Sequence, residues 1–198
     1  MTLTPIDPVT GELDPTALRS AFAAFPSGVV AVAAEVDGQP LGIAASSFTS
    51  VSLAPALVSF SVANTSATWP LLRAAGHLGL SVLADHHDAV CAQLAGPAEH
   101  RFDGLAVHAG EGGALLLDDA VVTFDCTIEQ EIEAGDHTIV LLALHAVDDD
   151  GGSPLVFHRS AFAKLHRDDL DPARLDGRIN GADVDRGAAD ATAKEDAA

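Results

Sequence analysis

The chain has 198 residues, with 29 acidic and 10 basic side chains, and its formal net charge is −19. Proteins that bind nucleic acid neutralise phosphates with clustered Lys and Arg, so this charge argues against nucleic acid as a partner. Hydrophobic residues make up 48% of the chain and charged residues 20%, which is enough apolar material for a core. The composition therefore predicts a soluble globular domain and argues against global disorder.

The charge is unevenly spread along the chain. Residues 166–198 hold nine acidic and five basic side chains, whereas residues 1–165 hold 20 acidic and again only five basic ones. These five are Arg19, Arg73, Arg101, Arg159 and Lys164. An anionic ligand bound to the first 165 residues must rely on one of them, or on backbone N–H groups and hydroxyls.

Neither the N-terminus nor the cysteines indicate export. The first 15 residues lack the basic start and apolar run of a signal peptide. Cys91 and Cys126 lie far apart without a CxxC motif, which fits a reducing cytoplasm. Residues 38–72 carry no Asp, Glu, Lys, Arg or His, but their three prolines and ten hydroxyl residues argue against a membrane-spanning helix. We therefore expect a cytoplasmic protein that does not enter membranes.

The first elements are read from turn and cap residues. Asp14 followed by proline predicts the start of an amphipathic helix, which ends before the Pro26-Ser27-Gly28 turn. Val29 to Val36 reads as a strand, and the hairpin signal Asp37-Gly38 joins it to a partner strand from Leu41 to about Ser46.

The middle of the chain alternates between strands and helices. Ala56 to Ala63 reads as a strand, and the polar loop 64–68 leads into a helix over 69–75 that a glycine ends. Leu78 to Leu83 then reads as a strand and Asp85 to Leu94 as a helix.

The clearest period of two runs from Val121 to Ile132. It predicts that one face carries Phe124, Cys126, Ile128 and Ile132, and that Asp125 lies on the opposite, polar face. A Gly135-Asp136 turn leads into a strand over 137–147, and Leu155 to His158 reads as another strand. Successive hairpins with inserted helices predict a mainly β, antiparallel barrel or sheet.

The chain is expected to divide into three parts. Residues 1–13 form an N-terminal arm, and residues 14–165 form the folded domain. Residues 166–198 are rich in Asp, Ala and Gly and poor in large apolar side chains, so we expect a disordered acidic tail.

Several catalytic motifs are missing from the sequence. It contains no GxGxxG, GxxxxGK[ST], GxSxG or HExxH pattern, which argues against a Rossmann dehydrogenase, a Walker-type NTPase, an α/β hydrolase and a zincin. Adjacent helical residues point about 100° apart, so His86-His87-Asp88 is read as a solvated helix start and no metal site is expected.

Hydroxyl groups are concentrated in residues 46–52. A buried hydroxyl without a partner costs roughly 1–3 kcal/mol, so these side chains either bond the local backbone or bind a polyhydroxylated or carbonyl-rich ligand. The loop 64–68 has a similar ambiguity. Ser66 or Thr68 either caps the following helix or helps its free N–H groups bind an anion.

Five segments resemble the flavin reductase-like family, the small reductase components of two-component flavin monooxygenases. They are residues 22–32, 42–58, 64–70, 135–140 and 155–159, and the likeness extends in the family's order over about residues 14–165. The SSFTSVSL and GDHTIV sequences are the specific ones.

The resemblance implies a fold and an activity. The fold is an FMN-binding split β-barrel of antiparallel Greek-key type, assembled as a homodimer. The activity is hydride transfer from NADH or NADPH to FMN or FAD, with the reduced flavin supplied to a separate flavin-dependent monooxygenase. Two alternatives stay open: an FMN-bound reductase that acts directly on an organic substrate, and a non-catalytic flavin-binding protein.

The resemblance also implies a set of site residues. His137 would be catalytic, beside the nicotinamide. The implied cofactor-binding positions are Pro26, Ser27, Gly28, Val29, Ala45, Ser46, Ser47, Asn64, Ser66, Thr68, Trp69, Arg101, Phe102, His137, His158 and Arg159.

Within this set, Asn64, Ser66 and Thr68 would surround the flavin phosphate. Many relatives have Lys or Arg where this chain has Asn64 and Ala67. This departure is compatible with a flavin that is exchanged as a substrate, and the scarcity of basic residues favours NADH over NADPH.

Overall fold

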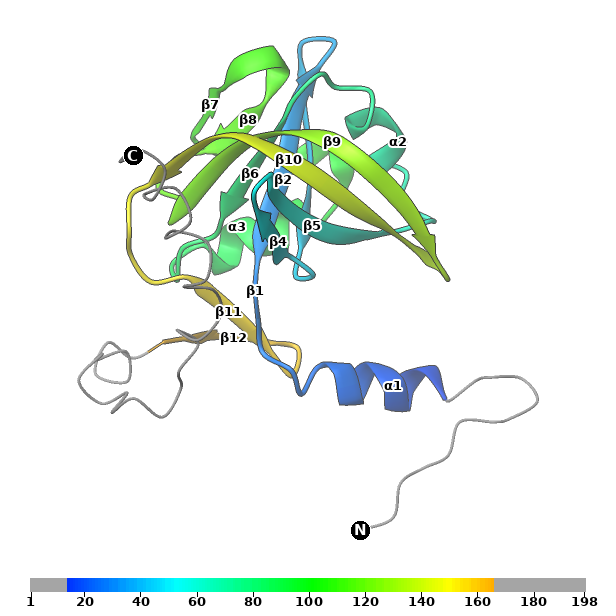
Figure 1. Ribbon diagram of the computed structural model, residues 1–198. Coiled ribbons are helices and arrows are strands. Elements are labelled where there is room, and N and C mark those ends of the chain that lie inside the picture. Colours follow the sequence, from blue (N-terminus) through cyan, green and yellow to red (C-terminus); the bar gives the residue numbers. More distant parts are fainter. Residues whose placement is uncertain (1–13, 166–198) are drawn as a thin grey trace, which may run out of the picture. The chain divides into compact units, whose positions relative to one another are not determined.

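The computed structural model describes residues 14–165, and most of them lie in strands (Figure 1). The expected N-terminal arm and acidic tail lie outside the described residues. The helices are α1 (Pro15–Phe22), α2 (Trp69–Leu72) and α3 (Asp88–Leu94). The strands are β1 (Ser27–Gly28), β2 (Val30–Val36), β3 (Gln39–Ala45), β4 (Thr49–Leu53), β5 (Ala56–Ala63), β6 (Leu78–Val82), β7 (Val107–Ala109), β8 (Leu115–Leu117), β9 (Val122–Ala134), β10 (His137–Asp149), β11 (Leu155–His158) and β12 (Ala161–Lys164).

Seven of these strands form one antiparallel sheet, in the order β3-β2-β6-β9-β10-β5-β4. β3 and β5 are not neighbours in this order but contact each other, because the sheet curls around the core. The long β9–β10 hairpin arches across the barrel in Figure 1. Two smaller sheets, β1-β11-β12 and β7-β8, complete the described fold. The mainly β, antiparallel architecture agrees with the prediction.

The predicted start of α1 and the predicted first hairpin are confirmed, but Ser27 and Gly28, which were expected in a turn, form the short strand β1. Asp14 caps α1, because its carboxylate accepts a hydrogen bond from the Thr16 N–H at 3.1 Å. In the β2–β3 turn, Asp37 and Gly38 have φ of 52° and 74°. A two-residue type I′ hairpin requires positive φ at both positions, which is why an Asp-Gly pair is found there.

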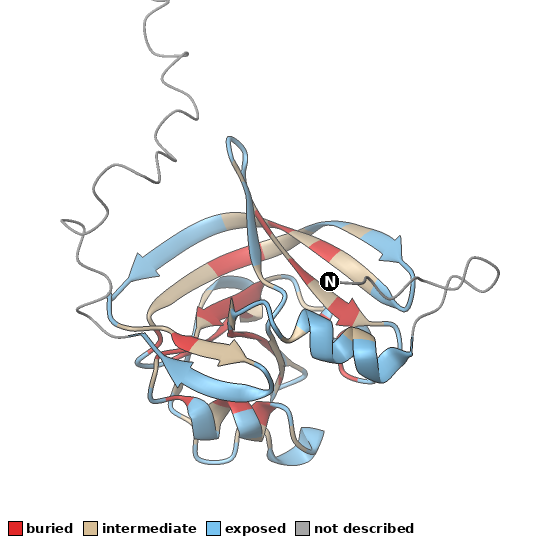
Figure 2. Ribbon diagram, turned by 90° about the horizontal axis from the view of Figure 1, so that it is seen from below, coloured by how far each residue is buried: buried red, intermediate tan, exposed pale blue. Residues whose placement is uncertain are grey.

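The core lies on both faces of β2. Five successive residues from Val30 to Ala34 are buried, and Figure 2 shows the buried segments concentrated on the central strands. Val30 and Val32 point into the barrel cluster with Phe60 and Leu80, while Ala31 points to a second cluster beneath α3. β2 is therefore fixed from both sides, which gives the adjoining β3 a rigid support.

Two β-bulges in the β9–β10 hairpin change which side chains point toward the core. Gln130 pairs with Leu141 and Ile128 with Leu142, so Glu129 is an extra residue on β9. The predicted alternation therefore holds for Phe124, Cys126 and Ile128 but fails beyond the bulge. Glu131 takes the inward position opposite the buried Val140, and Ile132 is 43% exposed. His145 is the extra residue of the second bulge, on β10.

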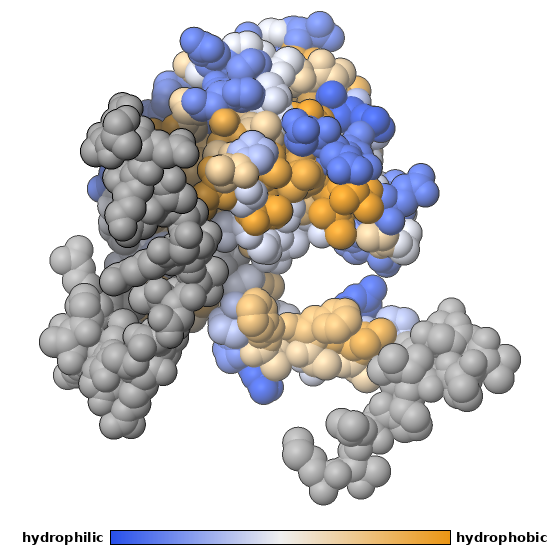
Figure 3. All heavy atoms as spheres, in the orientation of Figure 1, coloured by the Kyte–Doolittle hydropathy of each residue, from blue (hydrophilic) through white to orange (hydrophobic). Residues whose placement is uncertain are grey.

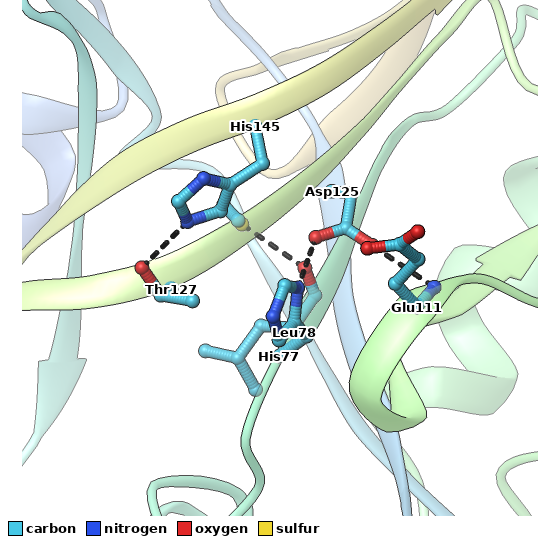
Figure 4. A network of polar contacts seen from close by, with 7 residues as sticks. His77, Leu78, Glu111, Asp125, Thr127 and His145 are labelled. Atoms are coloured by element: carbon cyan, nitrogen blue, oxygen red, sulfur yellow. Dashed lines mark hydrogen bonds and ion pairs between the residues drawn. The ribbon is translucent and has the colours of Figure 1, made fainter.

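Asp125 is buried, contrary to the predicted polar face. It is 7% exposed because Oδ1 bonds His77 Nδ1 and Oδ2 accepts the Glu111 N–H at 3.2 Å (Figure 4). His145 lies beside this pair and bonds Thr127 Oγ1 through Nε2 at 2.8 Å. These partners come from distant parts of the chain, so the local period of two could not indicate the burial of Asp125.

Other elements differ modestly from the prediction. Both inner helices are shorter than expected, and the strands β1, β4, β7, β8 and β12 were not predicted. His87 is 7% exposed and its Nδ1 accepts the Ala84 N–H at 3.1 Å, so the reading of its segment as a fully solvated helix start is wrong. Each helix in the described part of the chain is too short or too polar to span a membrane.

Candidate functional site

Two hollows adjoin at the C-terminal end of β3. One, which we call the serine hollow, has a volume of about 360 Å³ and lies between β3, β5 and the start of β10. It is lined by Ile43, Ala44, Ala45, Ser46, Ser47, Ser61, Val62, Ala63, Ser66 and His137. The other, which we call the apolar hollow, measures about 280 Å³ and is lined by Val29, Ala44, Ala45, Ser46, Cys91, Ala92, Ala95, Phe157 and Phe162. Ala44, Ala45 and Ser46 border both, so a ligand lying along this segment would contact both hollows.

Ser47 lies between β3 and β4, and its side chain bonds β5 beside the serine hollow. Its hydroxyl donates to the Ser61 carbonyl oxygen at 3.1 Å and accepts from the Ser61 N–H at 2.8 Å. Thr49 of β4 pairs with Ser59 of β5, so these two bonds continue the β4–β5 pairing by one further step through the Ser47 side chain. The sequence left two interpretations open for the hydroxyl-rich segment, and for Ser47 the structure shows the first of them, a hydrogen bond to the backbone.

The loop 64–68 is organised mainly by internal bonds. The N-cap residue of α2 is Thr68, whose side chain makes no capping bond, but Ser66 Oγ accepts the first N–H of the helix, that of Trp69, at 3.2 Å. The Ser66 side chain also borders the serine hollow. Thr68 is buried and its Oγ1 accepts a hydrogen bond from Arg101 Nη1 at 3.0 Å. Asn64 is exposed and does not border either hollow.

Trp69 faces the core rather than a hollow. It is 6% exposed, its ring lies edge-to-face on Phe60, and its Nε1 donates to Glu131 Oε1 at 2.8 Å. The other Glu131 oxygen pairs with Arg73 Nη2 at 2.6 Å. Glu131 thus anchors both ends of α2 to β9, which fixes the loop before it.

Arg101 and Phe102 fasten the segment after α3 to β3. The Arg101 guanidinium donates to the carbonyl oxygens of Gly96 and Gly42 at 2.9 and 2.8 Å, besides Thr68. The Phe102 ring lies against Gly42, where a Cβ would come within 2.6 Å of Phe102 Cζ. Both side chains stand behind the hollows and do not line them.

The N-terminal candidates gather around the β1–β11 pair. Ser27 pairs with Phe157 and Gly28 with Val156, but of the predicted residues 26–29 only Val29 borders a hollow. His158 and Arg159 follow Phe157 at the end of β11 and do not border a hollow.

The matches to known proteins agree with this arrangement. A profile of the flavin reductase like domain matches residues 22–166. The chain belongs to the flavin reductase-like family. It is 35% identical over 164 residues to the flavin reductase of Pseudomonas putida, covering 82% of this chain and 96% of that protein. It is also 37% identical over 146 residues to the reductase component of a flavin-dependent trigonelline monooxygenase of Acinetobacter baylyi, covering 73% of this chain but only 47% of that protein.

A solved structure matches the fold closely. The NADH:FAD oxidoreductase of Streptomyces globisporus C-1027, in complex with NAD and FAD fragments, superposes with a TM-score of 0.75 at 31% identity, over 84% of this chain and 99% of that one. The predicted fold class of this flavin reductase-like chain, a mainly antiparallel split β-barrel with inserted helices, is thereby confirmed.

Among the described residues that border the serine hollow, His137 is the one titratable side chain. It begins β10, pairs with Ala63 of β5, and its Nδ1 bonds Asp136 Oδ1 at 2.7 Å. The hydrogen bond to His137 and the charge of the imidazole hold the pKa of Asp136 below its ordinary value of 3.8. The ionised carboxylate then orients the ring with Nε2 left available.

Sequence reasoning missed one wall of the apolar hollow. Cys91 and Ala92 of α3, with the C-cap residue Ala95, supply this wall, and Phe157 and Phe162 supply another from the β11–β12 hairpin. Burial raises the pKa of the Cys91 thiol, so this side chain acts as a small apolar group. The small residues at i, i+1 and i+4 on a predicted helix were the available signal.

Proposed function

We propose that this protein is an NAD(P)H:flavin oxidoreductase that supplies reduced flavin to a separate flavin-dependent monooxygenase. The observation that carries the proposal is the pair of adjoining hollows at the end of β3 in a member of the flavin reductase-like family. The reductase component from Acinetobacter baylyi supports the monooxygenase partner.

The residues around the hollows suit a flavin. Alanines, Val29 and two phenylalanines offer a flat apolar wall for the isoalloxazine ring, and the serine hollow offers hydroxyls and backbone groups for polar atoms. When both molecules are bound, a hydride passes from nicotinamide C4 to flavin N5. The protein's own part is to stack the two rings between these walls and to exclude water.

His137 is proposed to contact the nicotinamide. Its ring stands at the border of the serine hollow, and Asp136 holds its orientation through Nδ1. Hydride transfer needs no proton donor, so orientation of the nicotinamide or its carboxamide is the role that the position supports.

Electrostatics favour a flavin that exchanges. Among the described residues, those that border the two hollows include no Lys or Arg, and the Arg101 guanidinium is bonded to carbonyl oxygens and a hydroxyl. A flavin phosphate must then depend on N–H groups and hydroxyls in a strongly acidic chain. We therefore propose FMN or FAD as an exchangeable substrate and NADH as the favoured reductant.

A homodimer is part of the proposal. None of the residues of α1 is buried, and Phe22 and Phe25 are 70% and 79% exposed. Figure 3 shows apolar side chains along α1. An amphipathic helix with no buried residue has an apolar face that a second copy of the chain would cover. We also place the protein in the cytoplasm, since Cys91 and Cys126 are both free thiols.

The test is flavin-dependent oxidation of NADH. Purified protein is mixed with NADH and with FMN, FAD or riboflavin, and the loss of NADH absorbance is followed. The proposal expects turnover with added flavin, and a flavin that separates from the protein on gel filtration. Tightly retained FMN would favour a reductase acting directly on an organic substrate, and no flavin-dependent loss of NADH would leave only a flavin carrier.

The role of His137 is tested in the same assay. We expect His137→Ala to raise the KM for NADH, because the proposed contact is lost. His145→Ala is the matched control, since His145 lies on the same strand but does not border either hollow of the proposed site. Unchanged kinetics for His137→Ala would show that the nicotinamide contact is made elsewhere.

A further inference from the structure

Both ends of the Asn64 side-chain amide bind the turn between β9 and β10. Nδ2 donates to the Gly135 carbonyl oxygen at 3.1 Å, and Oδ1 accepts from Thr138 Oγ1 at 2.9 Å. The backbone N–H of Asn64 donates to the Asp136 carbonyl oxygen at 3.0 Å. The three bonds reach residues on both sides of His137.

This geometry turns the Asn64 amide away from the hollows. The neighbouring Ala63 and Ser66 border the serine hollow, whereas Asn64 does not. Gly135 O can only accept a hydrogen bond, so it requires the NH₂ end of the amide, and the oxygen is left facing Thr138. The position that the resemblance assigned to the flavin phosphate is therefore occupied by a side chain committed to another loop.

The turn that Asn64 holds is short and exposed. Gly135 and Asp136 link the paired residues Ala134 and His137, and Gly135 has φ of 68°. All four residues from Ala134 to His137 are exposed, so core packing does not fix them. Asn64 fastens the backbone of this turn to the end of β5.

We propose that Asn64 is a positioning residue for His137 and does not bind the flavin phosphate. The inference rests on the proposed function, in which His137 contacts the nicotinamide. Asn64 fixes the backbone around His137, and Asp136 then orients its ring. The Asn64 side-chain amide thus connects the loop 64–68 to the part of the site where the nicotinamide is proposed to bind.

Steady-state kinetics with two flavins separate positioning from phosphate binding. Asn64→Ala is compared with wild type using FMN and using riboflavin, which has no phosphate. A positioning role predicts that kcat/KM for NADH falls about five- to tenfold with either flavin, the loss expected for removed hydrogen bonds. A phosphate contact would instead raise the KM for FMN alone, and that result would overturn the proposal.

Thr138 provides the second variant, away from the loop 64–68. Thr138→Val removes the bond to Asn64 Oδ1 and should lower kcat/KM for NADH in the same way, while Thr138→Ser keeps the hydroxyl and should restore it. The Asn64→Ala/Thr138→Val double variant should lose less than the product of the single losses. Thr127→Val is the matched control, because its hydroxyl bonds His145 outside the two hollows. A Thr138→Val enzyme with wild-type kinetics would contradict the proposal.

Hydrogen exchange tests whether Asn64 and Thr138 fix the β9–β10 turn, and it does not depend on enzyme activity. Backbone amides of residues 134–138 should exchange faster in Asn64→Ala and Thr138→Val than in wild type, with the rest of β9 and β10 unchanged. Unaltered exchange in both variants would overturn the positioning role. If wild type oxidises no NADH with any flavin, the proposed function fails, and the exchange data still decide whether Asn64 fixes the turn.

Discussion

The Ser47 hydroxyl both donates to and accepts from the backbone of Ser61, at 3.1 and 2.8 Å. One side chain thereby extends the pairing of β4 with β5 toward the end of β3. The serine hollow lies at this junction, so its width depends on the two bonds.

Replacing Ser47 should loosen the barrel where flavin is proposed to bind. We expect Ser47→Ala to lower the free energy of unfolding by about 1 kcal/mol, since each hydrogen bond contributes about 0.5–1.5 kcal/mol and water competes at this exposed site. The KM for flavin should rise in parallel. Urea denaturation and flavin titration measure the two effects. Ser50→Ala on the exposed edge strand β4 is the control, and an equal loss there would refute the special role of Ser47.

Adding a methyl group should destabilise the protein at one glycine and have no effect at another. A Cβ on Gly79 would collide with the backbone of Leu115, whereas a Cβ on Gly28 would meet nothing within 4 Å. Gly79→Ala should therefore destabilise the fold by about 1–3 kcal/mol, because backbone yields less readily than a side chain. Gly28→Ala should leave stability unchanged. Thermal unfolding of both variants checks the contrast, and similar melting temperatures would count against it.

Acid should lower the free energy of unfolding of the protein, because His87 becomes protonated. Burial, and next the charge of His86, lower the pKa of His87 from 6.5, and its Nδ1 must be unprotonated to accept the Ala84 N–H. Between the folded and unfolded pKa values the unfolded chain binds more protons, so stability is full above about pH 6.5 and falls as the pH drops below it.

Urea denaturation at several pH values measures this dependence. In His87→Gln the free energy of unfolding should decrease less between pH 7.5 and 5.5 than it does in wild type. In His86→Gln, which changes the exposed neighbour, most of the decrease should remain. An unchanged slope in His87→Gln would assign the acid sensitivity to another group.

The α1 face should control assembly. Burying one phenylalanine contributes about 1.5–3 kcal/mol, so Phe22→Ser with Phe25→Ser should remove several kcal/mol from a dimer interface and yield monomers. Light scattering after gel filtration gives the mass directly. Ser20→Ala on the same helix is the control. A wild type that is already monomeric at micromolar concentration would exclude the proposed dimer.

The sequence predicted elements whose signals are local. The positive φ values of Asp37 and Gly38, and the boundaries of β5 at Ala56 and Ala63, follow from nearest neighbours alone. Fold and family followed from motifs, as the match over residues 22–166 confirms.

What escaped prediction depends on distant partners. Asp125 is buried because His77, 48 residues away, bonds it. The side-chain bonds of Asn64 likewise run to residues 71 and 74 positions further along, which its own loop could not indicate. The missed strands β7 and β8 have three residues each, too few for a period of two to be recognised.

The extra residue Glu129 has a consequence for how such sequences can vary. Because side chains alternate along a strand, deleting this residue would exchange the two faces of β9 from Gln130 to its end. Ile132 would turn inward and Glu131 would release the Trp69 indole. In an alignment, a gap at residue 129 would therefore mark a chain that turns the neighbour of Glu131, and not its carboxylate, toward Trp69 and Arg73.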